Sequence, residues 1–246
     1  MLAICCFSCK KNNKREILLA ENHYLDIVGN PITDELILFA DSNYIYTKIY
    51  KSAEIENIEH RKGKFYIKND TIHFSRNLRQ DIESRTAIVR DNYFEIVDEE
   101  CYKIKVVKTE LPNRMTYDNQ KFKSYAIFSY CQARDSSLFK NAKPHELNND
   151  ELTQLDSLLE ICMSENTRLK TQNNNNYYKQ CIATENSDRE VVVWIYCICH
   201  KSGFIKENEF QLQLHGMVQD GGECFFKLKI NLTRKMFFGL LINGDA

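Results

Sequence analysis

The chain has 246 residues, and its 33 Lys and Arg against 34 Asp and Glu give a formal net charge of -1. A hydrophobic fraction of 43% and a charged fraction of 27% are ordinary for a globular protein of one or two domains and exclude wholesale disorder. The balanced charge gives no electrostatic sign of nucleic-acid binding, and no apolar run approaches the roughly 18 residues of a membrane-spanning helix.

An apolar N-terminal run ends in a small residue and a cysteine, Ser8 and Cys9, and the strongly polar stretch 10–15 follows it. This order resembles the end of a bacterial lipoprotein signal peptide, in which the lipid-bearing cysteine becomes the first residue of the mature chain. The resemblance implies lipid attachment, palmitate included, at Cys9 and assigns 1–15 to a signal, lipid-attachment and tether segment. The run lacks a basic beginning and is shorter than the usual ~7–15 apolar residues, which a start codon further upstream would explain.

Two other interpretations of the N-terminus stay open. Cys6 and Cys9 form a CxxC motif, which is typical of redox sites and of half a zinc site. A zinc site needs a second cysteine pair at comparable spacing and a thioredoxin-like motif needs a βαβ context, and the sequence supplies neither. A cytosolic chain with a disordered N-terminal tail is the remaining alternative.

Short strands separated by turn residues follow and predict a β-rich domain over 16–110. Runs of aromatic and β-branched residues, which suit a half-buried sheet, lie at 35–40, 44–50 and 102–107. Turns built from Asn and Asp predict two hairpins, at 64–74 and 86–97. Such near-regular spacing favours an antiparallel meander, barrel or sandwich. Basic residues around the first hairpin favour a solvated edge strand protected by lysine: Arg61, Lys62, Lys64 and Lys68.

Pro112 and the polar residues after it mark the best domain boundary, because proline restricts the residue before it. The second predicted domain covers 120–246 and begins with a strand at 125–130. It contains the one convincing helix of the chain, for which Asn148 and Glu151 form a capping box. The buried stripe of this helix recurs at three- and four-residue steps: Leu152, Leu155, Leu158, Leu159 and Cys162.

The charges of the predicted helix suit its dipole, with Asp150 at the start and Arg168 and Lys170 near the end. Four further strands are expected after it, at 177–182, 190–199, 224–230 and 237–242. The expected fold class is therefore α+β and β-rich. A barrel-like antiparallel unit is followed by one helix packed on a roughly four-stranded antiparallel sheet.

The second half also carries an ordered series of motifs, which begins at the helix and ends at Ala246. Its members are Tyr178-Lys179-Gln180-Cys181, Val193-Trp194-Ile195-Tyr196-Cys197-Ile198-Cys199, Asp220-Gly221-Gly222 and Asn243-Gly244-Asp245-Ala246. The series resembles a group of uncharacterised secreted or lipid-anchored proteins of Flavobacteria and related Bacteroidota, which prefer Asn and Phe at Tyr196 and Ile198. The similarity covers about 145–246 and implies a lipoprotein. It brings no activity, cofactor or catalytic residue.

The sharpest local cluster is formed by Cys197 and Cys199, with Cys224 as a neighbour on another strand. Residues two apart on a strand share a face, so both thiols point the same way. A packed core is the favoured interpretation, because free cysteine is among the most buried residues. A zinc site with His200 is less favoured, because the spacing is not that of a zinc knuckle. In an exported protein, a disulfide from Cys197 or Cys199 to Cys224 or Cys181 is the second interpretation.

No metal site, cofactor or catalytic residue is assigned from the sequence. Asp220-Gly221-Gly222-Glu223 is too short for a calcium loop and predicts a tight turn. The leading functional hypothesis is a lipid-anchored cell-envelope protein, on the periplasmic or outer face of a bacterial membrane. It would bind an unknown protein or small ligand without catalysis and without nucleic acid. The alternatives are an envelope or cytosolic hydrolase using His145, His200 or His215 beside a carboxylate, and an immunity-type inhibitor of a secreted toxin.

Overall fold

The structure is a computed structural model of the chain. It describes residues 14–25, 29–78, 85–97, 102–203, 205, 209–215, 218 and 220–244. The predicted lipid-attachment residue Cys9 and the CxxC motif lie outside these residues. In the described part of the chain, no helix is long and apolar enough to cross a membrane.

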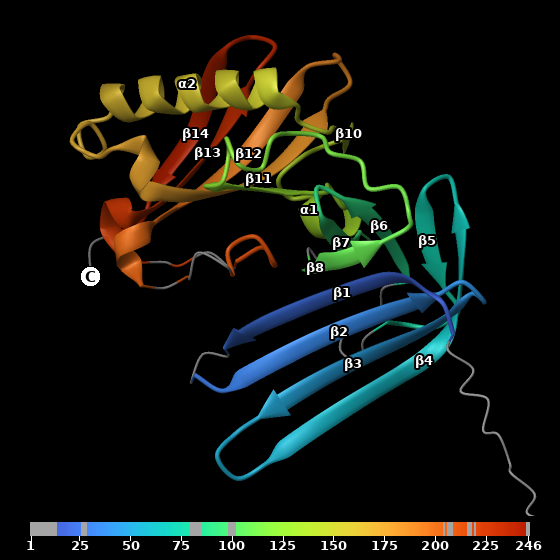
Figure 1. Cartoon of the computed structure of the whole chain (residues 1–246). Helices are drawn as coiled ribbons and strands as arrows, with labels where there is room; N and C mark the ends of the chain where they lie inside the picture. Colours follow the sequence, from blue (N-terminus) through green and yellow to red (C-terminus); the bar gives the residue numbers. More distant parts are fainter. Residues whose placement is uncertain are drawn as a thin grey trace, which may run out of the picture.

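Eight antiparallel strands close into a barrel in chain order, which selects the barrel among the three architectures expected for the first domain (Figure 1). The strands are β1 (Glu16–Leu25), β2 (Pro31–Phe39), β3 (Asn43–Lys51), β4 (Glu56–Lys68), β5 (Thr71–Phe74), β6 (Thr86–Arg90), β7 (Tyr93–Ile96) and β8 (Tyr102–Thr109). Strand β1 was not among the expected strands. It pairs with both β2 and β8, and this pairing closes the barrel.

Both predicted hairpins are confirmed, and their turns explain their register. Asn69 and Asp70 join β4 to β5 with φ values of 50° and 58°, and Asp91 and Asn92 join β6 to β7 with 52° and 66°. Two central residues with positive φ define the type I′ turn, whose twist matches that of the strands. Asn and Asp tolerate this conformation better than other side chains that carry a Cβ.

The edge-strand interpretation of the basic hairpin is wrong in part. β4 lies between β3 and β5, so it is an interior strand of the barrel order. Its pairing with β5, however, covers only Phe65–Lys68. Arg61, Lys62 and Lys64 lie in the part of β4 that pairs with β3, whereas Lys68 lies in the part that pairs with β5. Each part therefore has one paired neighbour among the described strands.

Among the described residues, six strands form the sheet of the second half, rather than the expected four (Figure 1). They are β9 (Tyr125–Phe128), β10 (Lys143–Pro144), β11 (Tyr177–Glu185), β12 (Val191–Cys199), β13 (Phe225–Asn231) and β14 (Met236–Ile242). The expectation of an all-antiparallel sheet is also wrong, because β9 runs parallel to β11. Parallel neighbours need a crossover connection, and the segment that contains the long helix supplies it.

The long helix α2 (Asn149–Glu165) begins as predicted. The Asn148 side chain accepts from the backbone N–H groups of Asp150 and Glu151, and the Glu151 carboxylate accepts from the Asn148 N–H. The predicted end is wrong, because the chain leaves the helix at Asn166, before Arg168 and Lys170. A one-turn helix α1 (Gln132–Asp135) and three short 3-10 turns complete the described elements: η1 (Asn174–Asn176), η2 (His200–Ser202) and η3 (Gly222–Cys224).

Both faces of the central strands of this sheet, β11 and β12, are buried. The predicted stripe of α2 packs on the face that carries Val193, Ile195, Phe226 and Leu228. The opposite face carries Trp194, which is only 5% exposed and packs with Phe128, Phe139 and Phe210. The single tryptophan is therefore a core residue, and its fluorescence reports the folding of this half of the molecule.

Candidate functional site

A disulfide joins Cys199 at the end of β12 to Cys224 just before β13, one of the pairings that the sequence left open. Cys197 shares the α2-facing core with Cys199 but remains a free, buried thiol. The predicted tight turn at Asp220–Glu223 is present, since Gly221 and Gly222 have φ values of 88° and 56°. Positive φ at both glycines lets the chain turn back so that Cys224 meets Cys199.

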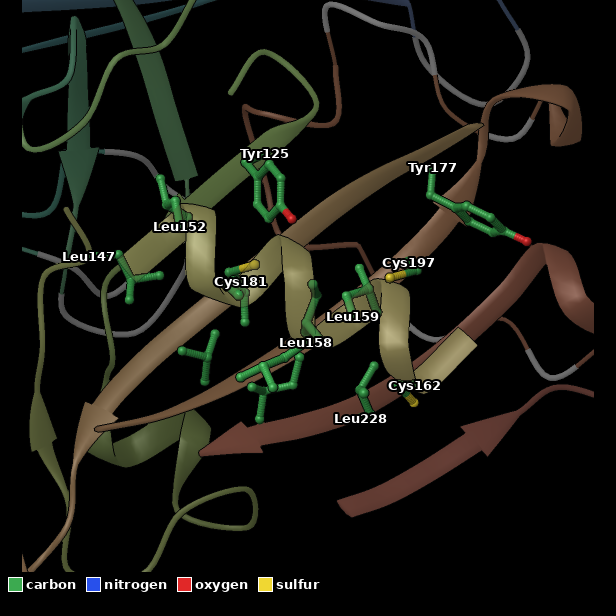
Figure 2. Packing of buried hydrophobic residues seen from close by; sticks show 14 of the residues in the cluster. Tyr125, Leu147, Leu152, Leu158, Leu159, Cys162, Tyr177, Cys181, Cys197 and Leu228 are labelled. Carbon is green, nitrogen blue, oxygen red and sulfur yellow. The ribbon is translucent and has the colours of Figure 1, made fainter. Parts of the chain in front are cut away.

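Three free thiols lie in the layer between α2 and the sheet, as Figure 2 shows for Cys162, Cys181 and Cys197. Burial raises the pKa of the Cys162 thiol to about 11 and holds the pKa values of Cys181 and Cys197 well above their ordinary range. The thiolate is the nucleophile and the metal ligand, so these side chains serve as packing groups at neutral pH. The described residues contain no group of three or more His, Cys, Asp or Glu that could hold a metal ion.

A buried lysine, which the sequence analysis missed, occupies the same layer. Lys179 on β11 is 1% exposed, and its Nζ lies 3.6 Å from Asp156 Oδ1 on α2 and 4.7 Å from the centre of the Tyr125 ring. Tyr125 and Asn174 donate hydrogen bonds of 2.6 Å and 2.8 Å to the same carboxylate oxygen. These contacts place the Lys179 ammonium beside the Asp156 carboxylate, which is itself hydrogen-bonded, and they connect α2 to the sheet.

A second buried cluster, centred on Glu95, joins the barrel to the sheet. Glu95 on β7 is 1% exposed, and its carboxylate accepts from the Arg90 guanidinium at 2.7 Å and from the Ser129 backbone N–H at 2.7 Å. Lys103 on β8 is 4% exposed and donates to the carbonyl of Ile127 on β9. One cation and one carboxylate of the barrel, Lys103 and Glu95, therefore bond backbone groups of residues 127–129 inside the molecule.

Backbone pairing continues this junction. The Lys103 N–H donates to the carbonyl of Leu212 at 2.6 Å, and Tyr102 forms an isolated bridge with Gln213. The segment 209–215 thus pairs with the first residues of β8, at the end of the strand where β1 and β8 no longer pair.

The three candidate histidines are not brought together around a reaction centre. His145 Nε2 lies 2.8 Å from Glu151 Oε1, but the same carboxylate caps α2. The ring of His200 packs on Tyr178 with a centroid distance of 4.1 Å. Burial lowers the pKa of His215, whose backbone N–H donates to the Gln180 side chain. The His145–Glu151 pair is therefore a structural contact at a helix start.

A polar cavity of about 370 Å³ lies where the barrel, the connecting segment and α2 meet. We call it the seam cavity, and its lining residues are Asn92, Met115, Thr116, Tyr117, Asp118, Asn119, Gln120 and Asn149. Asn119 donates to the Asp91 carbonyl at 2.9 Å, while its Oδ1 is buried and has no hydrogen-bond partner among the described residues. Amide groups that offer both donors and acceptors suit a small, neutral, hydrogen-bonding ligand.

Comparison with known protein families, curated proteins and solved structures finds no match.

Reduction of the Cys199–Cys224 disulfide is expected to lower the free energy of unfolding by about 3 kcal/mol, because the bond closes a loop that would otherwise gain entropy in the unfolded chain. The separation of 25 residues sets the loop length. Denaturant unfolding of the wild type and of Cys199→Ala, each with and without reductant, measures the effect. The variant should match the reduced wild type and should not respond to reductant, whereas a wild type insensitive to reductant would contradict the prediction.

Proposed function

We propose that this chain is a lipid-anchored protein of the bacterial cell envelope that binds a partner or small ligand without catalysis. The lipid on Cys9 would hold it at the membrane, and the polar segment that follows would act as a tether to the folded body. A lipoprotein that carries several acyl chains is held firmly, because each buried methylene adds about 0.8 kcal/mol to membrane binding.

The observation that carries the envelope assignment is the disulfide between Cys199 and Cys224. Disulfides persist in oxidising compartments such as the bacterial periplasm and are rare in the reducing cytosol. The bond therefore agrees with the lipoprotein pattern at Ser8 and Cys9, although it lies more than a hundred residues away in the sequence. Two separate parts of the chain thus support the same compartment.

The binding role is supported by what the polar groups of the molecule do. The buried charges form ion pairs or hydrogen bonds that connect structural elements, and the buried thiols near the disulfide are un-ionised. The seam cavity offers amide groups and one carboxylate. Such a lining can hold a hydrogen-bonding ligand. Its Thr116 hydroxyl already donates a hydrogen bond of 2.8 Å to Asp91.

Replacement of Cys9 with Ser is expected to abolish lipidation, because the hydroxyl cannot form the thioether of a lipoprotein. The native bacterium is grown with an alkyne-labelled palmitate, and label and membrane fraction are compared for wild type, Cys9→Ser and Cys6→Ser. The wild type and Cys6→Ser should be labelled and sediment with membranes, whereas Cys9→Ser should carry no label. An unlabelled, soluble wild-type protein that retains Met1 to Ser8 by mass spectrometry would overturn the proposal.

A further inference from the structure

The edge strand β14 presents an unusually apolar surface. Its seven residues, Met236 to Ile242, carry no charge, and among the described strands it pairs only with β13. Three large side chains on it are roughly half exposed: Met236 at 45%, Phe238 at 43% and Leu241 at 58%. Free main-chain groups beside apolar side chains form a template for pairing with another strand.

Two other open stretches of strand in the described part of the chain are protected. At the opposite side of the same sheet, β10 consists of only Lys143 and Pro144, and proline cannot extend a ladder. The part of β4 that pairs only with β3 carries Glu59, Arg61 and Lys62, and such charges discourage pairing. β14 has neither a proline nor a charge, so its edge differs from the other two.

A bulge at Gly239 decides which side chains share a face. From Lys229 to Lys227 β13 advances by two residues, while β14 advances by three, from Phe238 to Leu241. Gly239 has a φ of 64°, as the first residue of a glycine bulge requires. Phe237, Leu240 and Ile242 therefore pack toward the α2-side core, and the other three apolar side chains, Met236, Phe238 and Leu241, lie on the opposite face.

We propose that β14 pairs with β14 of a second copy of this chain, antiparallel, about a two-fold axis that passes between Gly239 and Leu240. Directly opposite residues of an antiparallel pair lie on the same face. This register sets Phe238 opposite Leu241 on the open face and Phe237 opposite Ile242 on the α2 face. A register shifted by one residue would set Phe238 opposite Leu240, which lies on the other face. The bulge therefore makes this strand complementary to itself.

The charges beside the strand favour the same arrangement. Arg234 and Lys235 stand immediately before β14. Parallel pairing would bring the two basic starts together, whereas antiparallel pairing separates them by the length of the strand. The two copies would join their sheets into one continuous sheet, with Phe238 and Leu241 of both copies covering one another at the junction. This inference does not depend on the lipid anchor.

Light scattering of the purified full chain tests the association. The wild type is expected to have the mass of two chains, and Phe238→Lys the mass of one. In the variant, each lysine would lie opposite the apolar Leu241 of the other copy, and the two lysines would bring like charges to the same junction. Ile161→Lys is the matched control, since Ile161 is 47% exposed on α2 and its variant should remain a dimer. A monomeric wild type, or a Phe238→Lys variant that stays dimeric with native Trp194 fluorescence, would overturn the proposal.

Cysteine cross-linking tests the register independently of variant stability. Phe238→Cys and Leu241→Cys are purified separately and mixed, and dissolved oxygen with a copper catalyst serves as oxidant. A disulfide-linked dimer should form in the mixture, where the two thiols are directly opposite, but in neither variant alone. Equal cross-linking in all samples and in the wild type, or none in a mixture that is dimeric by light scattering, would refute this register.

Discussion

Replacing Glu95 with Ala is expected to lower the free energy of unfolding by about 3–5 kcal/mol, the cost of breaking a buried ion pair by removing one partner. The substitution removes the carboxylate closest to the buried Arg90 guanidinium, at 2.7 Å, and leaves it with Asp91 at 3.6 Å and Glu146 at 3.3 Å. It also removes the carboxylate whose charge acts on the buried Lys103. It also removes the acceptor of the Ser129 backbone N–H. The loss falls on the junction between barrel and sheet, so the two halves should unfold less cooperatively.

Denaturant unfolding followed by Trp194 fluorescence and by far-ultraviolet circular dichroism measures this effect. The fluorescence reports the sheet half, while the dichroism reports both halves. Glu59→Ala is the matched control, because Glu59 pairs with Arg61 at 2.9 Å on the barrel surface, where an ion pair contributes only about 0–1 kcal/mol. If Glu95→Ala were no more destabilising than Glu59→Ala, the junction would not be an important source of stability.

The pKa of the Glu95 carboxylate predicts how the free energy of unfolding depends on pH. Burial alone would raise the pKa of Glu95, but Lys103, Arg90 and the hydrogen bonds from Ser129 outweigh it and lower the pKa below its ordinary 4.5. A lowered folded-state pKa contributes stability that is present above the unfolded value and is lost as the pH falls through the folded value. Unfolding at pH 7 and pH 3 should therefore show a smaller acid loss in Glu95→Gln than in the wild type. An equal loss in both proteins would contradict this assignment.

Truncating Leu159 to Ala is expected to cost about 2–5 kcal/mol, as for other buried leucines. Leu159 is fully buried between α2 and the sheet (Figure 2), so the smaller side chain leaves a cavity in the layer that holds the helix. Leu155→Ala should behave alike, because Leu155 is also fully buried. Since an isolated helix of this length is marginal in water, the sheet half should lose more stability than the barrel.

Ile161→Ala provides the control on the same helix, because Ile161 is 47% exposed and its truncation should change stability little. The Trp194 transition should shift to lower denaturant in Leu159→Ala but not in the control. A fragment of residues 120–246 tests the independence of the second domain. An unfolded fragment, or an unchanged stability of Leu155→Ala, would contradict the division into two units.

Local signals in the sequence were sufficient for much of the fold. The capping box at Asn148 and Glu151 determined where α2 begins, and the leucine spacing determined its buried face, because both depend on neighbours within a few residues. The turns at Asn69-Asp70 and Asp91-Asn92 determined two hairpins for the same reason. The end of α2 was missed because Asn166 ends it by backbone conformation, with no proline or glycine to signal the stop.

Only the tertiary structure decided what depends on residues far apart in the chain. Closure of the barrel by β1 and β8, the parallel pairing of β9 with β11 and the choice of Cys224 as partner of Cys199 each join distant segments. The buried charges at Glu95 and Lys179 were invisible for the same reason, since each charged residue in a strand looks solvent-facing until its partner is placed. The sequence by itself determined the start of α2, its buried face and two hairpins, and it marks the cysteine at which a lipid is expected. Which surfaces meet depends on non-local packing, because a side chain acquires its environment only when the whole chain has folded.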